Sequence, residues 1–146
     1  MTEQPDPFVE VRARIDALLE PVGGAPWWLR YGERVDGGYA GVLRHGDEWR
    51  WAAYERGRCT LDLRSRDPAD IAHHAVVDTA RWMLDHRPDP TTRLTRLVRP
   101  GSRDWRKRRV RHYAEHRALL RRIDRATADR WERENREVLV ELGLLG

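Results

Sequence analysis

Apolar residues recur at helical spacing near the start of the chain. Between Asp6 and Glu20 they fall three or four positions apart, which places them on one side of an α-helix. Asp6 followed by Pro7 suits the start of such a helix, and Pro21 suits its end. The pattern therefore predicts an amphipathic helix over residues 6–20. Its apolar residues are Phe8, Val11, Ile15, Leu18 and Leu19.

Four β-favouring runs follow. Residues 27–31 are mostly aromatic and predict a first strand. Residues 39–44, 48–55 and 58–64 predict three more, because short turns containing glycine separate them. Strands joined in this way form an antiparallel meander with one face that can be buried. Period-two alternation places Trp49, Trp51 and Ala53 on one face of their strand, and Cys59, Leu61 and Leu63 on one face of the next.

The strongest helix start in the chain is Asp67-Pro68-Ala69-Asp70. It combines an acidic cap, a proline at the first helical position and a second acid that the helix dipole favours. The predicted helix runs to about His86, where Arg87-Pro88-Asp89-Pro90 ends it. An apolar stripe along it would lie across the sheet and close the core. The stripe comprises Ile71, Ala75, Val76, Thr79, Trp82 and Met83.

Two more helices are predicted in the last third of the chain. After a connecting segment that contains Pro100-Gly101, apolar residues mark a long arginine-rich helix as far as Ile123. A last helix runs from about Ala126 to Leu142, and the two could pack as a helical hairpin. The apolar markers are Trp105, Tyr113, Leu119, Leu120 and Ile123 in the first, and Trp131, Val138, Leu139 and Leu142 in the second.

Strands come early in this order and helices come late, which indicates an α+β fold rather than an alternating α/β fold. A length of 146 residues is common for a single domain. We therefore predict one domain over residues 1–146. It should contain a small antiparallel β-meander packed against an N-terminal helix, a central helix and a C-terminal helical pair.

Composition adds two constraints. The first residues are polar and acidic, and no apolar run is long enough for a signal-peptide core or a membrane span. We therefore expect a cytoplasmic protein that has no membrane partner. Cys59 is the only cysteine, which excludes an internal disulfide and a paired-cysteine zinc site.

Positive charge is concentrated in one part of the chain. Residues 91–125 carry 13 basic and 3 acidic side chains, whereas residues 1–90 carry 12 and 16. Clustered cations bind phosphates by releasing counterions, so the run 103–111 favours a basic nucleic-acid-binding or regulatory module. Ordinary solvated helix surface is the alternative, since no nucleic-acid motif surrounds the run and its aromatic residues fit a buried stripe.

Enzymatic signals are weak. His112-Tyr113-Ala114-Glu115-His116 matches the H-x-x-E-H pattern of inverted zinc peptidases, but the tail beyond it offers no histidine as a third ligand. His73-His74 with Asp78 offers a base and a carboxylate, yet neither serine lies in a nucleophile elbow and Cys59 has no histidine beside it in sequence. We therefore expect no catalytic residues, no metal and no cofactor.

Short aromatic and charged motifs recur along the whole chain. The first half contains Trp27-Trp28-Leu29, Tyr31-Gly32-Glu33, Val35-Asp36-Gly37 and Tyr54-Glu55-Arg56-Gly57, and the second contains Arg103-Asp104-Trp105-Arg106, Leu119-Leu120, Ile123-Asp124, Trp131 and Arg133-Glu134. In this order they resemble the immunity protein 63 family of bacterial polymorphic toxin systems. The chain departs from the family in its arginine-rich residues 93–125 and in its apolar end, residues 142–146.

The resemblance implies a cytoplasmic protein that binds a cognate toxin domain and neutralises it, without a cofactor and without catalysis. A basic surface would meet an acidic surface of the toxin, and aromatic residues would anchor the contact. Trp27 and Trp28 are adjacent, so on a strand one of them would stay at the surface. The residues expected to bind the partner are Trp28, Tyr31, Arg103, Arg106, Lys107 and Arg109.

Overall fold

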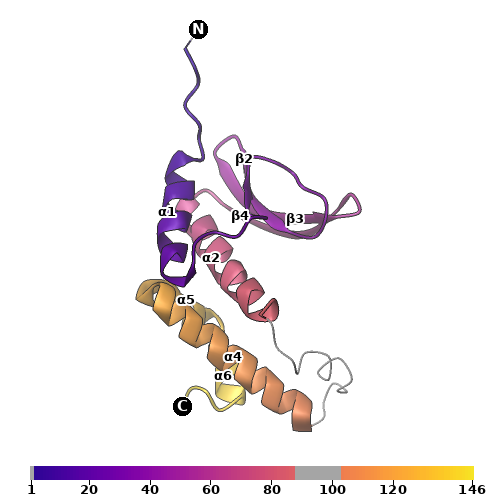
Figure 1. Cartoon of the computed structure of the whole chain (residues 1–146), viewed down its shortest axis with the longest axis vertical. Coiled ribbons are helices and arrows are strands. Elements are labelled where there is room, and N and C mark those ends of the chain that lie inside the picture. The colour runs from indigo at the N-terminus through magenta and orange to yellow at the C-terminus, as the bar shows by residue number, and fades with distance from the viewer. Residues whose placement is uncertain (1, 88–102) are drawn as a thin grey trace. The chain divides into compact units, whose positions relative to one another are not determined.

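The computed structural model describes residues 2–87 and 103–146, and it has the expected α+β fold (Figure 1). The predicted connecting segment with Pro100-Gly101 lies outside these residues. In chain order the elements are α1 (Val9–Leu19), a 3-10 turn η1 (Glu20–Val22), β1 (Arg30–Tyr31), β2 (Ala40–His45), β3 (Glu48–Glu55), β4 (Arg58–Ser65), α2 (Pro68–Asp85), α4 (Arg103–Ile123), α5 (Arg125–Glu134) and α6 (Arg136–Glu141).

Contacts between residues divide the chain into two compact units. The first is Met1–Thr79 and the second is Ala80–Gly146, so the boundary falls inside α2. That the whole chain behaves as one domain stays a prediction.

The sheet of the first unit is mixed. Its strand order is β1-β2-β3-β4, and the last three strands form the predicted antiparallel meander. β1, which lies outside that meander, pairs with β2 in parallel. Gly41 allows the pairing, because a Cβ atom at this position would lie 3.2 Å from the carbonyl oxygen of Arg30.

The first strand is also shorter than predicted. Leu29 donates its backbone N–H to the carbonyl oxygen of Pro26 at 3.2 Å, so Trp27 and Trp28 are the central residues of a turn. Only Arg30 and Tyr31 then pair with β2. Aromatic residues favour strands, but this hydrogen bond commits the two tryptophans to the turn.

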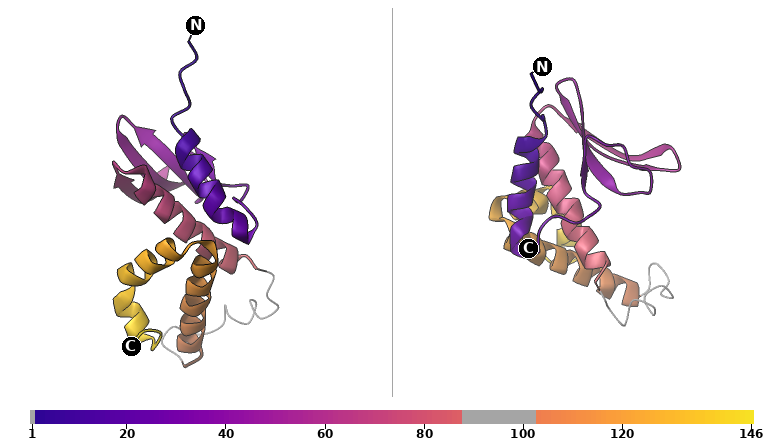
Figure 2. Two further views of the ribbon diagram at one scale, coloured as in Figure 1. Left: turned by 90° about the vertical axis from the view of Figure 1, so that its left-hand side faces the viewer. Right: turned by 45° about the horizontal axis from the view of Figure 1, so that its top comes forward.

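One face of the sheet is covered by helices. Figures 1 and 2 show α1 and α2 side by side next to the sheet. The ring of Phe8, before α1, meets Trp49 edge-on at 5.6 Å, and the Trp51 indole N–H donates to Asp78 Oδ2 at 2.6 Å. Trp51 is fully buried, as are the residues Ile15, Leu19, Val42, Ile71 and Val76.

The predicted start of α2 is confirmed, whereas α1 begins later than predicted. The Asp67 carboxylate accepts the backbone N–H of Ala69 at 2.9 Å, as expected of a cap, and α2 begins at Pro68. The Asp6 carboxylate accepts the backbone N–H of Phe8 at 2.9 Å, but the regular turns of α1 begin only at Val9.

The second unit contains a helical pair whose second member is broken. Asp124 caps α5 by accepting the backbone N–H and the hydroxyl of Thr127, at 2.9 and 2.8 Å. The prediction of one last helix was wrong, because Asn135 separates α5 from α6. Its side-chain amide donates to the carbonyl oxygen of Trp131 at 2.8 Å, and asparagine competes with helical hydrogen bonding in this way.

Candidate functional site

The arginine-rich helix α4 begins with residues that the sequence placed at a partner surface. Arg103 and Lys107 are exposed, one helical turn apart, and neither has an ion pair or hydrogen bond with any residue that the structure describes. Arg103 and Lys107 form the basic surface of α4. Trp105 lies two positions from each of them, so its side chain, which is 37% exposed, belongs to another face of the helix.

The other two predicted arginines are engaged within the unit. Arg106 donates to the carbonyl oxygen of Glu141 at 3.1 Å. The Arg109 guanidinium lies 5.4 Å from the ring centre of Trp105, 5.8 Å from that of Tyr113 and 4.0 Å from the Glu141 carboxylate. Arginines over aromatic rings and carbonyls stabilise the unit, so half of the predicted basic set has a structural role.

Arg117 binds the C-terminal segment that follows α6. Gly143, at φ 74°, and Leu144 donate their backbone N–H groups to Val140 and Leu139, which closes α6 with a Schellman motif. Arg117 then donates to the carbonyl oxygen of Leu144 at 2.9 Å. The apolar end of the sequence is therefore an ordered cap.

The two predicted aromatic anchors lie in the first unit. Trp28 is 5% exposed and stacks on Tyr39, with ring centres 5.4 Å apart. Tyr31 packs between Phe8 at 6.4 Å and the Arg12 guanidinium at 4.8 Å, and burial raises the pKa of its hydroxyl. Both side chains mainly support the fold of this unit.

The exposed member of the tryptophan pair is Trp27. It keeps 69% of its surface accessible, and its ring meets Tyr39 edge-on at 5.4 Å. The expectation that one of the pair stays at the surface is confirmed, although a turn and not a strand separates the two. Sequence reasoning favoured Trp28, and Pro26 was the signal for a turn that it missed.

The predicted site residues belong to different units: Trp28 and Tyr31 to the first, and the basic residues to the second. Each unit therefore has its own candidate residues.

The H-x-x-E-H sequence in α4 has a packing role. His116 is 5% exposed and its ring lies 4.9 Å from that of Trp131 on α5. Glu115 is bound by Arg87 at 2.6 Å and Arg111 at 3.1 Å. Burial opposes ionisation of this carboxyl, but the two arginines outweigh it and lower its pKa. Across residues 2–87 and 103–146, no group of three or more potential metal ligands comes together.

The His73-His74-Asp78 set is also used structurally. The Asp78 carboxylate accepts the indole N–H of Trp51 and so joins α2 to the sheet. His73 is buried, and its ring lies 5.4 Å from that of His74. The Asp78 carboxylate therefore has a structural role, as the acceptor of the Trp51 hydrogen bond.

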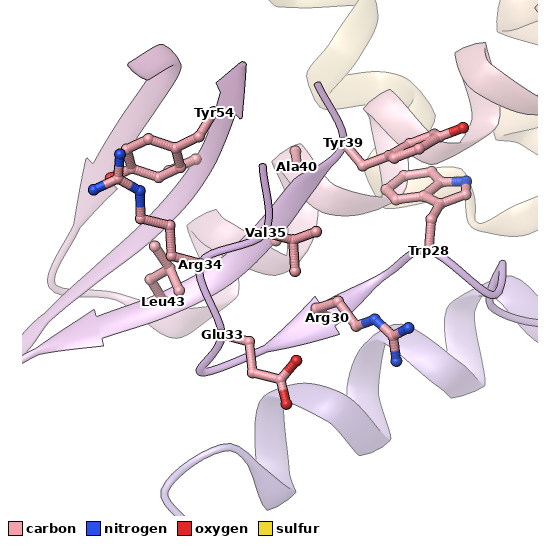
Figure 3. Close-up of a pocket in the computed structure, with 11 residues that line it drawn as sticks. Trp28, Arg30, Glu33, Arg34, Val35, Tyr39, Ala40, Leu43 and Tyr54 are labelled. Carbon is pink, nitrogen blue, oxygen red and sulfur yellow. The ribbon is translucent and has the colours of Figure 1, made fainter. Parts of the chain in front are cut away.

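A shallow hollow lies on the sheet face opposite to Trp51 (Figure 3). Its lining includes Gly41, Leu43 and Ala52 of the sheet, and the charged residues Glu33 and Arg34 of the loop between β1 and β2. The enclosed volume is about 10 Å³, which is roughly the space for one water molecule. A small-molecule site needs hundreds of Å³, so this hollow is suited only to surface contacts.

The comparisons with known proteins identify no relative. No family model matches the chain, and neither the curated proteins nor the solved structures contain a match. Within the described residues, no helix combines the length and apolar character that a membrane crossing requires.

Proposed function

We propose that this protein is a cytoplasmic immunity protein that binds and neutralises a cognate toxin domain. The observation that carries the proposal is the basic surface of α4. Arg103 and Lys107 are exposed and have no acidic partner among the described residues. An acidic protein surface would complement these two cations.

The arrangement of the remaining arginines favours protein over nucleic acid. Arg106, Arg109 and Arg117 bind groups of the C-terminal segment. Arg111 binds Glu115, and Arg121 binds Glu132 at 2.6 Å. Affinity for a phosphate backbone grows with the number of cations that are free to neutralise it, and these contacts lower that number among the described residues of the basic segment.

The first experiment is affinity capture of the tagged protein from its native cells, followed by nuclease treatment and mass spectrometry. We expect one large protein, retained near one-to-one, whose terminal domain kills cells unless this chain is co-expressed. Recovery of nucleic acid alone, through a salt-sensitive interaction, would contradict the proposal and favour the basic nucleic-acid-binding module.

Charge reversal then tests the surface. The double variant Arg103→Glu, Lys107→Glu should slow association with the captured toxin domain by about tenfold at low salt, and by less at high salt. Arg133→Glu, Arg136→Glu is the matched control, since both residues are exposed in the same unit and the change in charge is equal. Equal effects of the two double variants would show that only net charge matters.

A further inference from the structure

Trp27 is the most exposed large hydrophobic side chain in the described part of the protein, at 69%. Its ring is nevertheless held in place. Tyr39 supports it edge-on, and Tyr39 in turn lies almost parallel to buried Trp28, at an interplanar angle of 20°. An exposed ring with such support loses little conformational freedom when a partner covers it, which is the property of a binding anchor.

Tyr39 also connects Trp27 to the hollow on the outer sheet face. Figure 3 shows Tyr39 and Trp28 at one end of the hollow and Arg34 over Tyr54 at the other. Val35, on the rim, is 37% exposed. Exposed apolar area of Trp27 and Val35 is therefore linked to the hollow, which is too small to enclose a side chain, so that a partner's side chain would lie against this surface.

The loop that forms the rim is fixed to the sheet. Gly37 and Gly38 donate their backbone N–H groups to the carbonyl oxygen of Tyr54, at 3.0 and 2.8 Å. The Asp36 carboxylate accepts the backbone N–H of Gly57 at 3.1 Å. The hollow is therefore preformed, and a partner need not order this loop on binding.

The charges on this sheet face are distributed unevenly. Near β4, Arg50 and Arg64 share Asp62, at 2.8 and 2.9 Å. Beside the hollow lie Arg30, Glu33 and Arg34, and neither arginine has an ion pair with a carboxylate in the described parts of the chain. The Arg34 guanidinium lies 4.0 Å from the ring centre of Tyr54 and donates to Gly57 O, which leaves further N–H groups free. A stacked guanidinium with free donors is preorganised for a carboxylate.

We propose that the surface formed by Trp27, Arg30, Arg34, Val35 and Tyr39 docks a protein loop that carries an apolar side chain flanked by carboxylates. The apolar side chain lies against Trp27 and the hollow, and the carboxylates pair with the two arginines. That this loop belongs to a toxin rests on the function proposed above, whereas the chemistry of the loop follows from the surface itself.

Selection from a displayed library of random dodecapeptides against the full-length protein tests the proposal. We expect enrichment of peptides that combine an aromatic or aliphatic residue with two or more acids. Binding of a synthetic peptide from this set, measured by fluorescence polarisation, should weaken roughly tenfold or more in Trp27→Ala and in Arg30→Gln. Arg64→Gln is the control, because this arginine lies on the same sheet face but is paired with Asp62.

Several outcomes would overturn the proposal: no enrichment, enrichment of basic peptides, or acidic peptides whose affinity is the same in Trp27→Ala and the wild type. A single-stranded oligouridine probe that binds the wild type and is lost in Trp27→Ala would replace the protein loop with a stacked base. Circular dichroism of each variant establishes that it is folded. Failure of the toxin proposal would appear separately, as absence of a captured toxin with the peptide selection unaffected.

Discussion

Arginine side chains in this protein have three kinds of partner. Arg50 binds a carboxylate, Arg34 lies over an aromatic ring, and Arg117 donates to a backbone carbonyl. The carboxylate of Asp62 offsets the charge of Arg50, and the carbonyl group takes up a donor of Arg117, whereas Arg34 over its ring keeps N–H groups for a partner. A count of basic residues along the sequence therefore overstates the charge available for binding.

The ion pairs of Asp62 predict a dependence of stability on pH. Hydrogen bonds from Arg50 and Arg64 lower the pKa of Asp62 in the folded state. The contribution of the pairs is therefore complete above the unfolded-state pKa of about 4, and it is lost as the pH falls through the lower folded-state value. Asp62→Asn should lower the free energy of unfolding near pH 7 by up to about 1 kcal/mol, since the group is partly solvated.

Urea unfolding of both proteins between pH 7 and about pH 2 measures this effect. The difference between wild type and Asp62→Asn should shrink as the pH falls below about 4. A difference that stays constant over this range would mean that the carboxylate contributes by packing and not by charge.

At the scale of elements, short side-chain contacts decide where helices begin and end. Asp67 was recognisable from the sequence because it precedes a proline at the first helical position. Asn135 was not, because asparagine occurs inside helices as well as at their ends. The break becomes evident only from its hydrogen bond to the Trp131 carbonyl and from the two separate helices, α5 and α6.

The cap of α5 carries a prediction at this scale. Asp124→Ala removes the acceptor of two hydrogen bonds from Thr127, so we expect a loss of about 1 kcal/mol in the free energy of unfolding. Asp129→Ala is the control. This carboxylate is exposed, lies within α5 and does not cap the helix, and its contact with Arg125 is long, at 4.0 Å. Thermal denaturation followed by circular dichroism compares the two. Equal shifts in Tm would show that the cap contributes nothing specific.

At the scale of the whole molecule, two compact units share one helix. The boundary between Thr79 and Ala80 lies within α2, which is continuous from Pro68 to Asp85. Unfolding of either unit would remove the packing from part of this helix, and a helix segment without packing is only marginally stable in water. The two units should therefore unfold together.

This cooperativity is tested by comparing the unfolding transitions that two spectroscopic probes report. Urea unfolding followed by circular dichroism and by tryptophan fluorescence should give one midpoint and one slope, because tryptophans occur in both units. Two separate transitions would show that the units are independent domains, and would contradict the prediction of a single domain over residues 1–146.

The sequence by itself determined the α+β class, the meander of residues 40–65 and the approximate ends of α2 and α4. These features follow from local causes: period-two and helical spacing, turn glycines, and an acid followed by a proline. They depend on residues only a few positions apart, so they can be predicted from the amino-acid sequence alone.

Only the tertiary structure decided the parallel pairing of β1, the burial of Trp28 with exposure of Trp27, and the division of the arginines into paired and free. The physical reason is that each depends on residues distant in sequence. Gly41 admits β1, Tyr39 supports the tryptophans, and Glu141 engages Arg106 and Arg109 from more than thirty positions away. The spacing of residues along the chain does not predict such contacts.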